Sequence, residues 1–505
     1  MRRAIAFIAG IAALTLGSAA CAEAPIVRVE SGELVGEATT RANIFRNVPY
    51  AAPPVGPLRW APPQRAIAWE GRRDATKNGP SCPQRMNANG TPNGGGANGP
   101  TSEDCLQLNV FAPLKAKKAP VMVWIHGGAH TAGAGWVYDG QNFARDGVVV
   151  VSINYRLGPL GYFAHPALTR AAGAGEPLGS YGLMDQIAAL EWVKRNIAAF
   201  GGDPGNVTVF GESAGGMSIL HLLATPKAKG LFHKAIVQSG GGWFEPDGLA
   251  TKEKEGAAVA EKLGLPGASA SAEQLRAAPA DELIAKGGGG YGPFPDGRLV
   301  KETPTQALAA GREIDVPLII GWNSGEDSLM GPRPPDPAAA AARFPAAGSP
   351  AYADEAAQGG ERLPRAAFTD AVFGAPARWV AAQAADGRPA WLYHFSYVGG
   401  RFRPAMTTAA HAAEIQYVFE YWGRRTPESA ITDEDRAMAK LMHGCWVAFA
   451  KTGAPTCDVA WPKYQPGKDQ LVEFGDQSGV RTGFRDPKFD AQEAALLPTL
   501  ALPTN

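Results

Sequence analysis

One serine stands in a short pattern that could make it a catalytic nucleophile. The pattern G-x-S-x-G occurs at residues 211–215, directly after the apolar run 207–210 and before the apolar run 217–223. The first run predicts a strand and the second a helix. A sharp turn from strand to helix strains the serine backbone, exposes its hydroxyl and places it at a helix N-terminus, where developing negative charge is stabilised. We therefore predict Ser213 as a nucleophile. The alternative is a glycine-rich turn with a capping serine.

A serine hydroxyl is a weak nucleophile and needs a general base, which a carboxylate must orient. In chains with this turn the order is serine, acid, histidine, which leaves His394, His411 and His443 as candidates. His394 lies in an apolar strand-like run and His443 in an apolar helical run, so both are predicted to be packed structural residues. His411 lies among small residues that suit an exposed loop, and we predict it as the base.

The acid is expected just after a strand, at its carboxyl end. The apolar run 316–320 is followed by a loop that carries Glu326 and Asp327. The residue types alone do not separate these two carboxylates, and solvated turn residues are the alternative for both.

Backbone N–H groups that converge on one point could hold an oxyanion, and glycine-rich turns permit this arrangement. The sequence His-Gly-Gly-Ala at 126–129 directly follows a predicted buried strand. Ala214, the residue after the predicted nucleophile, would supply a further N–H. The sequence therefore predicts an oxyanion hole built from these two segments.

Alternating strands and helices must position these groups. Short, continuously apolar runs predict strands buried on both faces, as in a parallel sheet, and residues 183–197 show helical periodicity. The strands are expected at 121–125, 148–153, 207–210, 231–238, 316–320 and 391–397, with a chain break at 201–205. This order predicts an α/β fold with a largely parallel sheet. The Ala-, Gly- and Pro-rich stretches 251–290 and 331–365 are expected to be helical or loop insertions over the sheet.

Composition excludes several classes of protein. The chain has 505 residues, and its 48 basic and 48 acidic side chains leave a formal charge of zero. Such a chain has no electrostatic footprint for nucleic acid or for an anionic membrane surface. Its 45% hydrophobic and 19% charged residues are typical of a globular protein.

The N-terminus predicts a secretory signal peptide over residues 1–22. Two arginines precede the apolar run 4–16, small residues follow, and Ala-Cys-Ala at 20–22 offers a cleavage site. A lipid-anchored Cys21 is the less favoured alternative, because Ser18 stands where leucine is usual. No later run approaches the ~18 apolar residues of a membrane span. We expect a secreted or periplasmic protein with one domain over residues 23–505.

Four cysteines remain after removal of the signal peptide, namely Cys82, Cys105, Cys445 and Cys457. An even number in an oxidising compartment predicts disulfides, and four cysteines allow three pairings. The local pairs 82–105 and 445–457 close the shortest loops. The alternative is buried free thiols.

At this point the sequence resembles a family, the type-B carboxylesterases of the α/β-hydrolase fold, which includes bacterial para-nitrobenzyl esterases and animal cholinesterases. The resemblance extends over essentially the whole mature chain. It is carried by residues 200–216, which are similar to the family's serine signature, and by 47–59, 103–110 and 154–158. It implies a central, mostly parallel twisted sheet flanked by helices, with helical and loop insertions over the active site.

The resemblance also implies roles for single residues. Ser213 matches the nucleophile, Glu326 the acid and His411 the base. It further implies oxyanion donors at Gly128, Ala129 and Ala214, and the 82–105 disulfide. The chain departs from the family in having Gly-Glu-Asp at 325–327, Ala129 in place of a glycine and Ala412 after the histidine.

These residues predict hydrolysis of small-molecule carboxylic esters through an acyl-enzyme. We expect no metal and no other cofactor, since no ligand cluster, P-loop or dinucleotide motif is recognisable. No tryptophan lies between Cys82 and Cys105, so a quaternary ammonium substrate is not expected. The alternatives are a non-catalytic binding protein on the same fold and another acyl hydrolase, such as a lactonase, amidase or polyester hydrolase. No feature of the sequence indicates which oligomeric state the protein has.

Overall fold

The strands at the centre of the molecule are covered on both faces. In β7 (Ala119–Ile125), Val121 and Val123 belong to one hydrophobic cluster, whereas Met122 and Trp124 belong to another. Successive side chains of a strand point to opposite faces. A continuously apolar run therefore fits a sheet with a packed layer on each side.

The main sheet has eleven strands in the order β14-β13-β12-β11-β10-β9-β7-β8-β6-β4-β3. Its central pairs, from β8 through β13, are parallel, and the pairs at both ends are antiparallel. A second sheet contains β1, β2 and β5. The remaining strands are β1 (Ile26–Val29), β2 (Gly32–Val35), β3 (Glu37–Ala38), β4 (Asn43–Pro49), β5 (Arg72–Asp74), β6 (Gln107–Ala112), β8 (Val149–Ile153), β9 (Gly202–Glu212), β10 (Lys234–Gln238), β11 (Leu318–Asn323), β12 (Ala390–Phe395), β13 (Gln470–Phe474) and β14 (Gly479–Thr482).

This computed structural model describes residues 23–502 apart from 244, 332–335 and 424–425. The predicted signal peptide, Cys21 included, lies outside the described residues. None of the described helices combines the length and the apolar character needed to cross a membrane.

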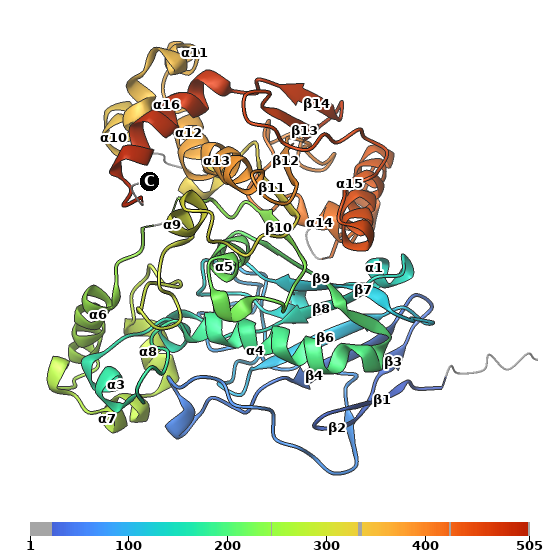
Figure 1. Cartoon of the computed structure of the whole chain (residues 1–505), viewed down its shortest axis with the longest axis vertical. Coiled ribbons are helices and arrows are strands. Elements are labelled where there is room, and N and C mark those ends of the chain that lie inside the picture. The colour runs from blue at the N-terminus through green and yellow to red at the C-terminus, as the bar shows by residue number, and fades with distance from the viewer. Residues whose placement is uncertain (1–22, 244, 332–335, 424–425, 503–505) are drawn as a thin grey trace, which may run out of the picture.

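Helices pack on both faces of the sheet. Helices α4, α5 and α13 contribute to one hydrophobic cluster, and α1, α14 and α15 contribute to the other. In Figure 1, α15 lies on one side of the strands and α5 and α13 on the other. The helices are α1 (Gln141–Arg145), α2 (Gly158–Gly161), α3 (Pro166–Ala171), α4 (Tyr181–Asn196), α5 (Ala214–Leu223), α6 (Leu249–Lys262), α7 (Ala272–Ala277), α8 (Ala280–Lys286), α9 (Pro304–Ala309), α10 (Pro337–Arg343), α11 (Ala353–Ala357), α12 (Arg362–Thr369), α13 (Ala375–Ala384), α14 (Ile415–Val418), α15 (Asp433–Thr452) and α16 (Asp486–Leu496).

The predicted α/β fold with a mostly parallel sheet is confirmed. The two expected insertions form helices α6 to α8 and α10 to α12, which lie at the lower left and at the top of Figure 1. The predicted break at 201–205 is wrong in part, because β9 begins at Gly202. Gly202 pairs with Ala119, and the register then shifts before Val207 pairs with Val121. The glycines and proline therefore form an irregular beginning of this strand. Strand β10 begins at Lys234, three residues later than expected.

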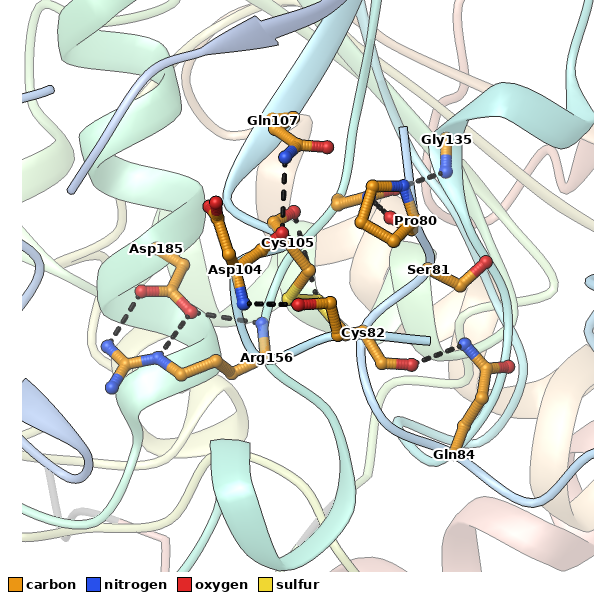
Figure 2. Close-up of a disulfide and its surroundings, with 12 residues drawn as sticks. Pro80, Ser81, Cys82, Gln84, Asp104, Cys105, Gln107, Gly135, Arg156 and Asp185 are labelled. Carbon is orange, nitrogen blue, oxygen red and sulfur yellow. Dashed lines mark hydrogen bonds and ion pairs between the residues drawn. A yellow bond between two sulfur atoms is a disulfide. The ribbon is translucent and has the colours of Figure 1, made fainter. Parts of the chain in front are cut away.

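The four cysteines form two disulfides, Cys82–Cys105 and Cys445–Cys457. Figure 2 shows the first of them beside the start of β6. Gln84 donates a hydrogen bond to the carbonyl of Cys82 at 3.0 Å. The buried ion pair Arg156–Asp185, at 2.7 Å, lies nearby. The disulfide thus anchors a surface loop to the core of the N-terminal half.

Candidate active site

Ser213 occupies the turn between β9 and α5. Its backbone has φ 55° and ψ −123°, a strained conformation for a residue with a side chain. Only glycine fits at positions 211 and 215, because a Cβ on Gly211 or Gly215 would lie 2.6 or 1.9 Å from the carbonyl oxygen of Ile125. The two glycines let the turn lie against β7, and this turn places Ser213 at the carboxyl end of the central strand.

His411 and Glu326 meet beside this turn. Glu326 follows β11, and His411 lies in the loop between β12 and α14. The Nδ1 atom of His411 is 2.5 Å from Oε2 of Glu326, which is fully buried. Carboxyl ends of neighbouring parallel strands meet at one edge of a sheet, and this brings residues from distant parts of the sequence together. His411 is less exposed than the sequence suggested, with 11% of its side chain accessible.

Other groups fix the Glu326 carboxylate. Its Oε1 accepts hydrogen bonds from the Ser239 hydroxyl at 2.6 Å and from the Asn323 backbone N–H at 2.7 Å. The neighbouring Asp327 instead pairs with Arg365 at 3.0 Å. Of the two acids that the sequence left open, the structure brings Glu326 to the histidine.

Glu212, which sequence reasoning did not single out, lies on the other side of the His411 ring. Its Oε1 is 3.0 Å from Nε2 of His411 but has no partner in hydrogen-bond geometry. Burial alone would lower the pKa of His411, but the charges of Glu212 and Glu326 outweigh it and raise this pKa well above its usual value. The available signal was the position of Glu212, directly before the predicted nucleophile at the end of a strand.

The hydroxyl of Ser213 forms no hydrogen bond with the described residues, so the bond from nucleophile to base is not formed in this structure. Ser213 is held instead through its backbone, since its N–H donates to the carbonyl of Gln238 at 2.9 Å. Catalytic hydrogen bonds often tighten only when substrate binds.

The glycine turn after β7 lies directly against Ser213. A Cβ on Gly127 would lie 3.0 Å from the Cβ of Ser213. The backbone of Gly128 and Ala129 is left-handed, with φ of 104° and 53°. Among the described residues, no hydrogen bond is donated by the N–H groups of Gly128, Ala129 or Ala214. The three N–H groups predicted as oxyanion donors are therefore not used within the described structure, and an oxyanion hole requires such unused donors.

Beneath these groups, Glu414 is completely buried. Its two oxygens accept hydrogen bonds from Gln238 at 2.9 Å and from Asn323 at 2.6 Å. Burial, and next the charge of Glu212, raise the pKa of Glu414 to about 7. A buried carboxyl group with a raised pKa thus lies within the same network.

The other two histidine candidates lie elsewhere. His394 is buried in β12, where burial lowers its pKa. His443, in α15, contacts the carbonyl of Val418 and the carboxylate of Asp146. Asp146, Glu420 and His443 could together ligate a metal ion, but Arg145 already pairs with both carboxylates.

A cavity of about 800 Å³ opens beside the site. Gly127, Gly128, Glu212 and His411 are among the residues that line it. Aromatic side chains from the segments 136–138 and 397–422 form much of its wall. The volume is in the range of cavities that bind small organic molecules.

The fold and this site define a class of protein. Residues 23–347 and 353–492 match the sequence model of the carboxylesterase family, and the chain belongs to that family. It is a carboxylic ester hydrolase.

Particular relatives are similar over most of their length. The para-nitrobenzyl esterase of Bacillus subtilis (strain 168) is 36% identical over 478 residues, which cover 87% of this chain and 92% of that protein. The fumonisin B1 esterase of Sphingopyxis macrogoltabida is 35% identical, with 87% and 84% covered. A solved structure of a PNB esterase superposes with a TM-score of 0.82 at 33% identity, covering 92% of this chain and 99% of that one.

Proposed function

We propose that the protein hydrolyses small-molecule carboxylic esters in two steps, with Ser213 as nucleophile, His411 as base and Glu326 as the orienting acid. The observation that carries the proposal is the contact between Glu326 and Nδ1 of His411 beside the strained turn of Ser213. The pairing leaves Nε2 on the side of the ring where the serine turn lies.

In the first step His411 accepts the proton of the Ser213 hydroxyl while its oxygen attacks the ester carbonyl. The N–H groups of Gly128, Ala129 and Ala214 stabilise the negative oxygen. His411 then gives the proton to the departing alcohol, and the acyl group remains on Ser213. In the second step water loses a proton to His411 and attacks the acyl-enzyme, which releases the acid and restores the serine hydroxyl. Glu326 stabilises the imidazolium in both steps.

The test compares wild type with Ser213→Ala on p-nitrophenyl acetate, p-nitrophenyl butyrate and a p-nitrobenzyl ester. The relatives named para-nitrobenzyl esterase motivate the third substrate. We expect kcat to fall by about 10³-fold or more, since the residual rate would come only from the oxyanion donors and binding. Unchanged thermal unfolding serves as the control for folding. Equal turnover by both proteins would exclude Ser213 as the nucleophile.

We also propose that the protein is exported from the cytoplasm. The predicted signal peptide directs the chain out of the cytoplasm, and two disulfides are typical of a protein that folds in an oxidising compartment. The mature N-terminus is then expected at Glu23, which intact-mass measurement of the exported protein tests. A lipid-modified Cys21 at the N-terminus would contradict cleavage at that site.

A further inference from the structure

In the proposed function, on which this inference rests, the oxyanion hole combines N–H groups from two segments, and a buried histidine links them. Gly128 and Ala129 lie in the turn after β7, whereas Ala214 begins α5. His130 directly follows the first two, and its Nε2 lies 3.0 Å from the hydroxyl oxygen of Ser218. Ser218 comes four residues after Ala214, one turn along the same face of α5. A side-chain hydrogen bond thus connects the two donor segments.

The turn that carries Gly128 and Ala129 has an unfavourable backbone. Gly128, Ala129 and His130 have positive φ angles of 104°, 53° and 56° in succession. For residues with a side chain this conformation costs free energy, and it persists only where the surroundings hold it. The carbonyl of His130 accepts a hydrogen bond from the N–H of Gly158 at 2.7 Å, and its ring contacts Ser218. The fold therefore holds the turn at His130 through both backbone and side chain.

The ring of His130 is enclosed in the protein and stays neutral. It is 1% exposed and packs edge-on against Tyr162, with ring centroids 5.0 Å apart. Burial lowers the pKa of His130 to about 4, although the backbone carbonyls of Tyr291 and Ala214 favour its charged form. A neutral imidazole has one nitrogen that accepts a hydrogen bond. His130 can therefore accept from the hydroxyl of Ser218 throughout the pH range in which an ester hydrolase with a histidine base works.

Ser218 is itself fixed by a third element. Gln186, in α4, donates from its amide nitrogen to the hydroxyl oxygen of Ser218 at 3.0 Å, and both residues are fully buried. A hydroxyl has one proton to donate. Because the amide already donates to the oxygen, the proton of Ser218 is available for Nε2 of His130. Each hydrogen bond in the series Gln186, Ser218, His130 thus has a direction.

The two partners act without touching the substrate. Neither His130 nor Ser218 is among the described residues that line the large cavity. We infer that His130 is a positioning residue of the esterase reaction, whose hydrogen bond to Ser218 fixes the turn of Gly128 and Ala129 relative to Ala214 and so aims the N–H groups of both segments at the oxyanion.

The first experiment removes the hydrogen bond from the histidine side. His130→Phe keeps a ring against Tyr162 but cannot bind Ser218. We expect kcat for p-nitrophenyl butyrate to fall by about 10-fold and KM to change by less than about 2-fold, because the displaced donors act on the transition state. His130→Gln, whose amide can still bind Ser218, should return kcat to within about 3-fold of wild type. An unchanged kcat in His130→Phe would overturn the proposal.

The matched control replaces another buried histidine. His165 is fully buried, its Nδ1 accepts a hydrogen bond from the N–H of Ala167 at 3.1 Å, and its Nε2 lies 3.1 Å from the carbonyl oxygen of Gly267. His165→Phe should lower Tm, because it removes these contacts, and should leave kcat within about 2-fold of wild type. An equal loss of kcat in His165→Phe and His130→Phe would reduce the role of His130 to folding stability and overturn the proposal.

A trifluoromethyl ketone separates a displaced oxyanion turn from a general disturbance. With pentyl trifluoromethyl ketone, the oxygen of Ser213 bonds to the carbonyl carbon, its proton passes to His411, and the carbonyl electrons form a negative oxygen in the oxyanion hole. The corresponding alcohol has no carbonyl and forms no such bond. His130→Phe should raise the Ki of the ketone by about 10-fold and that of the alcohol by less than about 2-fold. Equal weakening of both inhibitors would indicate a disturbed cavity and contradict the role of His130.

The last experiment breaks the same hydrogen bond from the other side. Ser218→Ala leaves the turn after β7 unaltered and should also lower kcat by about 10-fold. If the two residues act through their shared hydrogen bond, the double variant His130→Phe/Ser218→Ala is expected to lie within about 2-fold of the poorer single variant. A loss of about 100-fold in the double variant would mean that the two residues act independently.

Failure of this role is distinguishable from failure of the proposed function. If Ser213→Ala retains the turnover of wild type, the nucleophile itself is wrong. If Ser213→Ala loses turnover while His130→Phe and Ser218→Ala keep the kcat and ketone affinity of wild type, the esterase mechanism stands and only the role of His130 is wrong.

Discussion

The two nitrogens of the His411 ring face very different surroundings. On the Nδ1 side, Glu326 is fully buried, and each of its oxygens has a partner from the histidine, Ser239 or Asn323. On the Nε2 side, Glu212 lies at 3.0 Å without hydrogen-bond geometry, and the large cavity begins there. The first side is built to hold the ring in one orientation. The second is left incomplete, as is expected where a substrate must enter and a proton must move.

The largest effect on kcat is expected from removing the charge on the Nδ1 side. Glu326→Gln is expected to lower kcat by about 10³-fold, because an amide neither stabilises the imidazolium nor fixes the tautomer that leaves Nε2 free to accept a proton. Asp327→Asn is the matched control, since Asp327 pairs with Arg365, and it should change kcat by less than about 3-fold. Steady-state hydrolysis of p-nitrophenyl butyrate measures both. If Asp327→Asn shows the large loss of kcat and Glu326→Gln the small one, Asp327 is the orienting acid.

The second prediction concerns the Nε2 side and its charge. Burial lowers the pKa of His411, while Glu212 and Glu326 raise it to well above the usual value. A base must be neutral to accept a proton, so kcat/KM should rise with pH as His411 loses its proton. Glu212→Gln removes one of the two charges that raise this pKa, and the acidic limb of the pH profile should therefore move to lower pH.

Glu414→Gln is the control for that shift. Burial, and next Glu212, raise the pKa of Glu414 to about 7, so Glu414 could itself produce the acidic limb of the pH profile. If His411 carries the limb, Glu414→Gln leaves a limb in the profile. A limb that disappears in Glu414→Gln, or that stays in place in Glu212→Gln, contradicts the assignment to His411.

The sequence predicts a nucleophile, a base and two possible acids because each leaves a local signal: a glycine-flanked serine after a strand, a loop of small residues around a histidine, and a pair of carboxylates after a strand. Contacts made across the fold left no such signal. Glu326 and Asp327 are neighbours of equal chemistry, and only the direction of each side chain, toward His411 or toward Arg365, separates them. The role of Glu212 depends in the same way on a loop that lies almost 200 residues further along the chain.

The same reasoning explains the error in β9. Glycine and proline at 201–205 indicate a break when they are considered locally. In the fold, Gly202 pairs with Ala119 before the register shifts, so the neighbouring strand extends the sheet through residues that have low strand propensity.

A third element contacts His411, and it should matter least. Phe373 packs against the imidazole with ring centroids 5.5 Å apart and an interplanar angle of 49°. It lies in the π-helical turn Asp370–Gly374 between α12 and α13, a widened turn of the kind often found at functional sites. Arg485 and Tyr352 bind the Asp370 carboxylate and fix this turn. The turn therefore supports the ring without adding charge to it.

Because the contact of Phe373 with His411 is apolar, its loss should loosen the ring without changing its protonation. Phe373→Leu is expected to lower kcat by about 3-fold and to leave the acidic limb of the pH profile where wild type has it. Phe344→Leu is the matched control, since Phe344 packs against Phe368 in the neighbouring insertion and no ring contact joins it to His411. A displaced limb in Phe373→Leu would mean that this face also sets the charge of His411. The difference between the two nitrogens, each beside a carboxylate, and the uncharged support of the ring by Phe373 would then no longer hold.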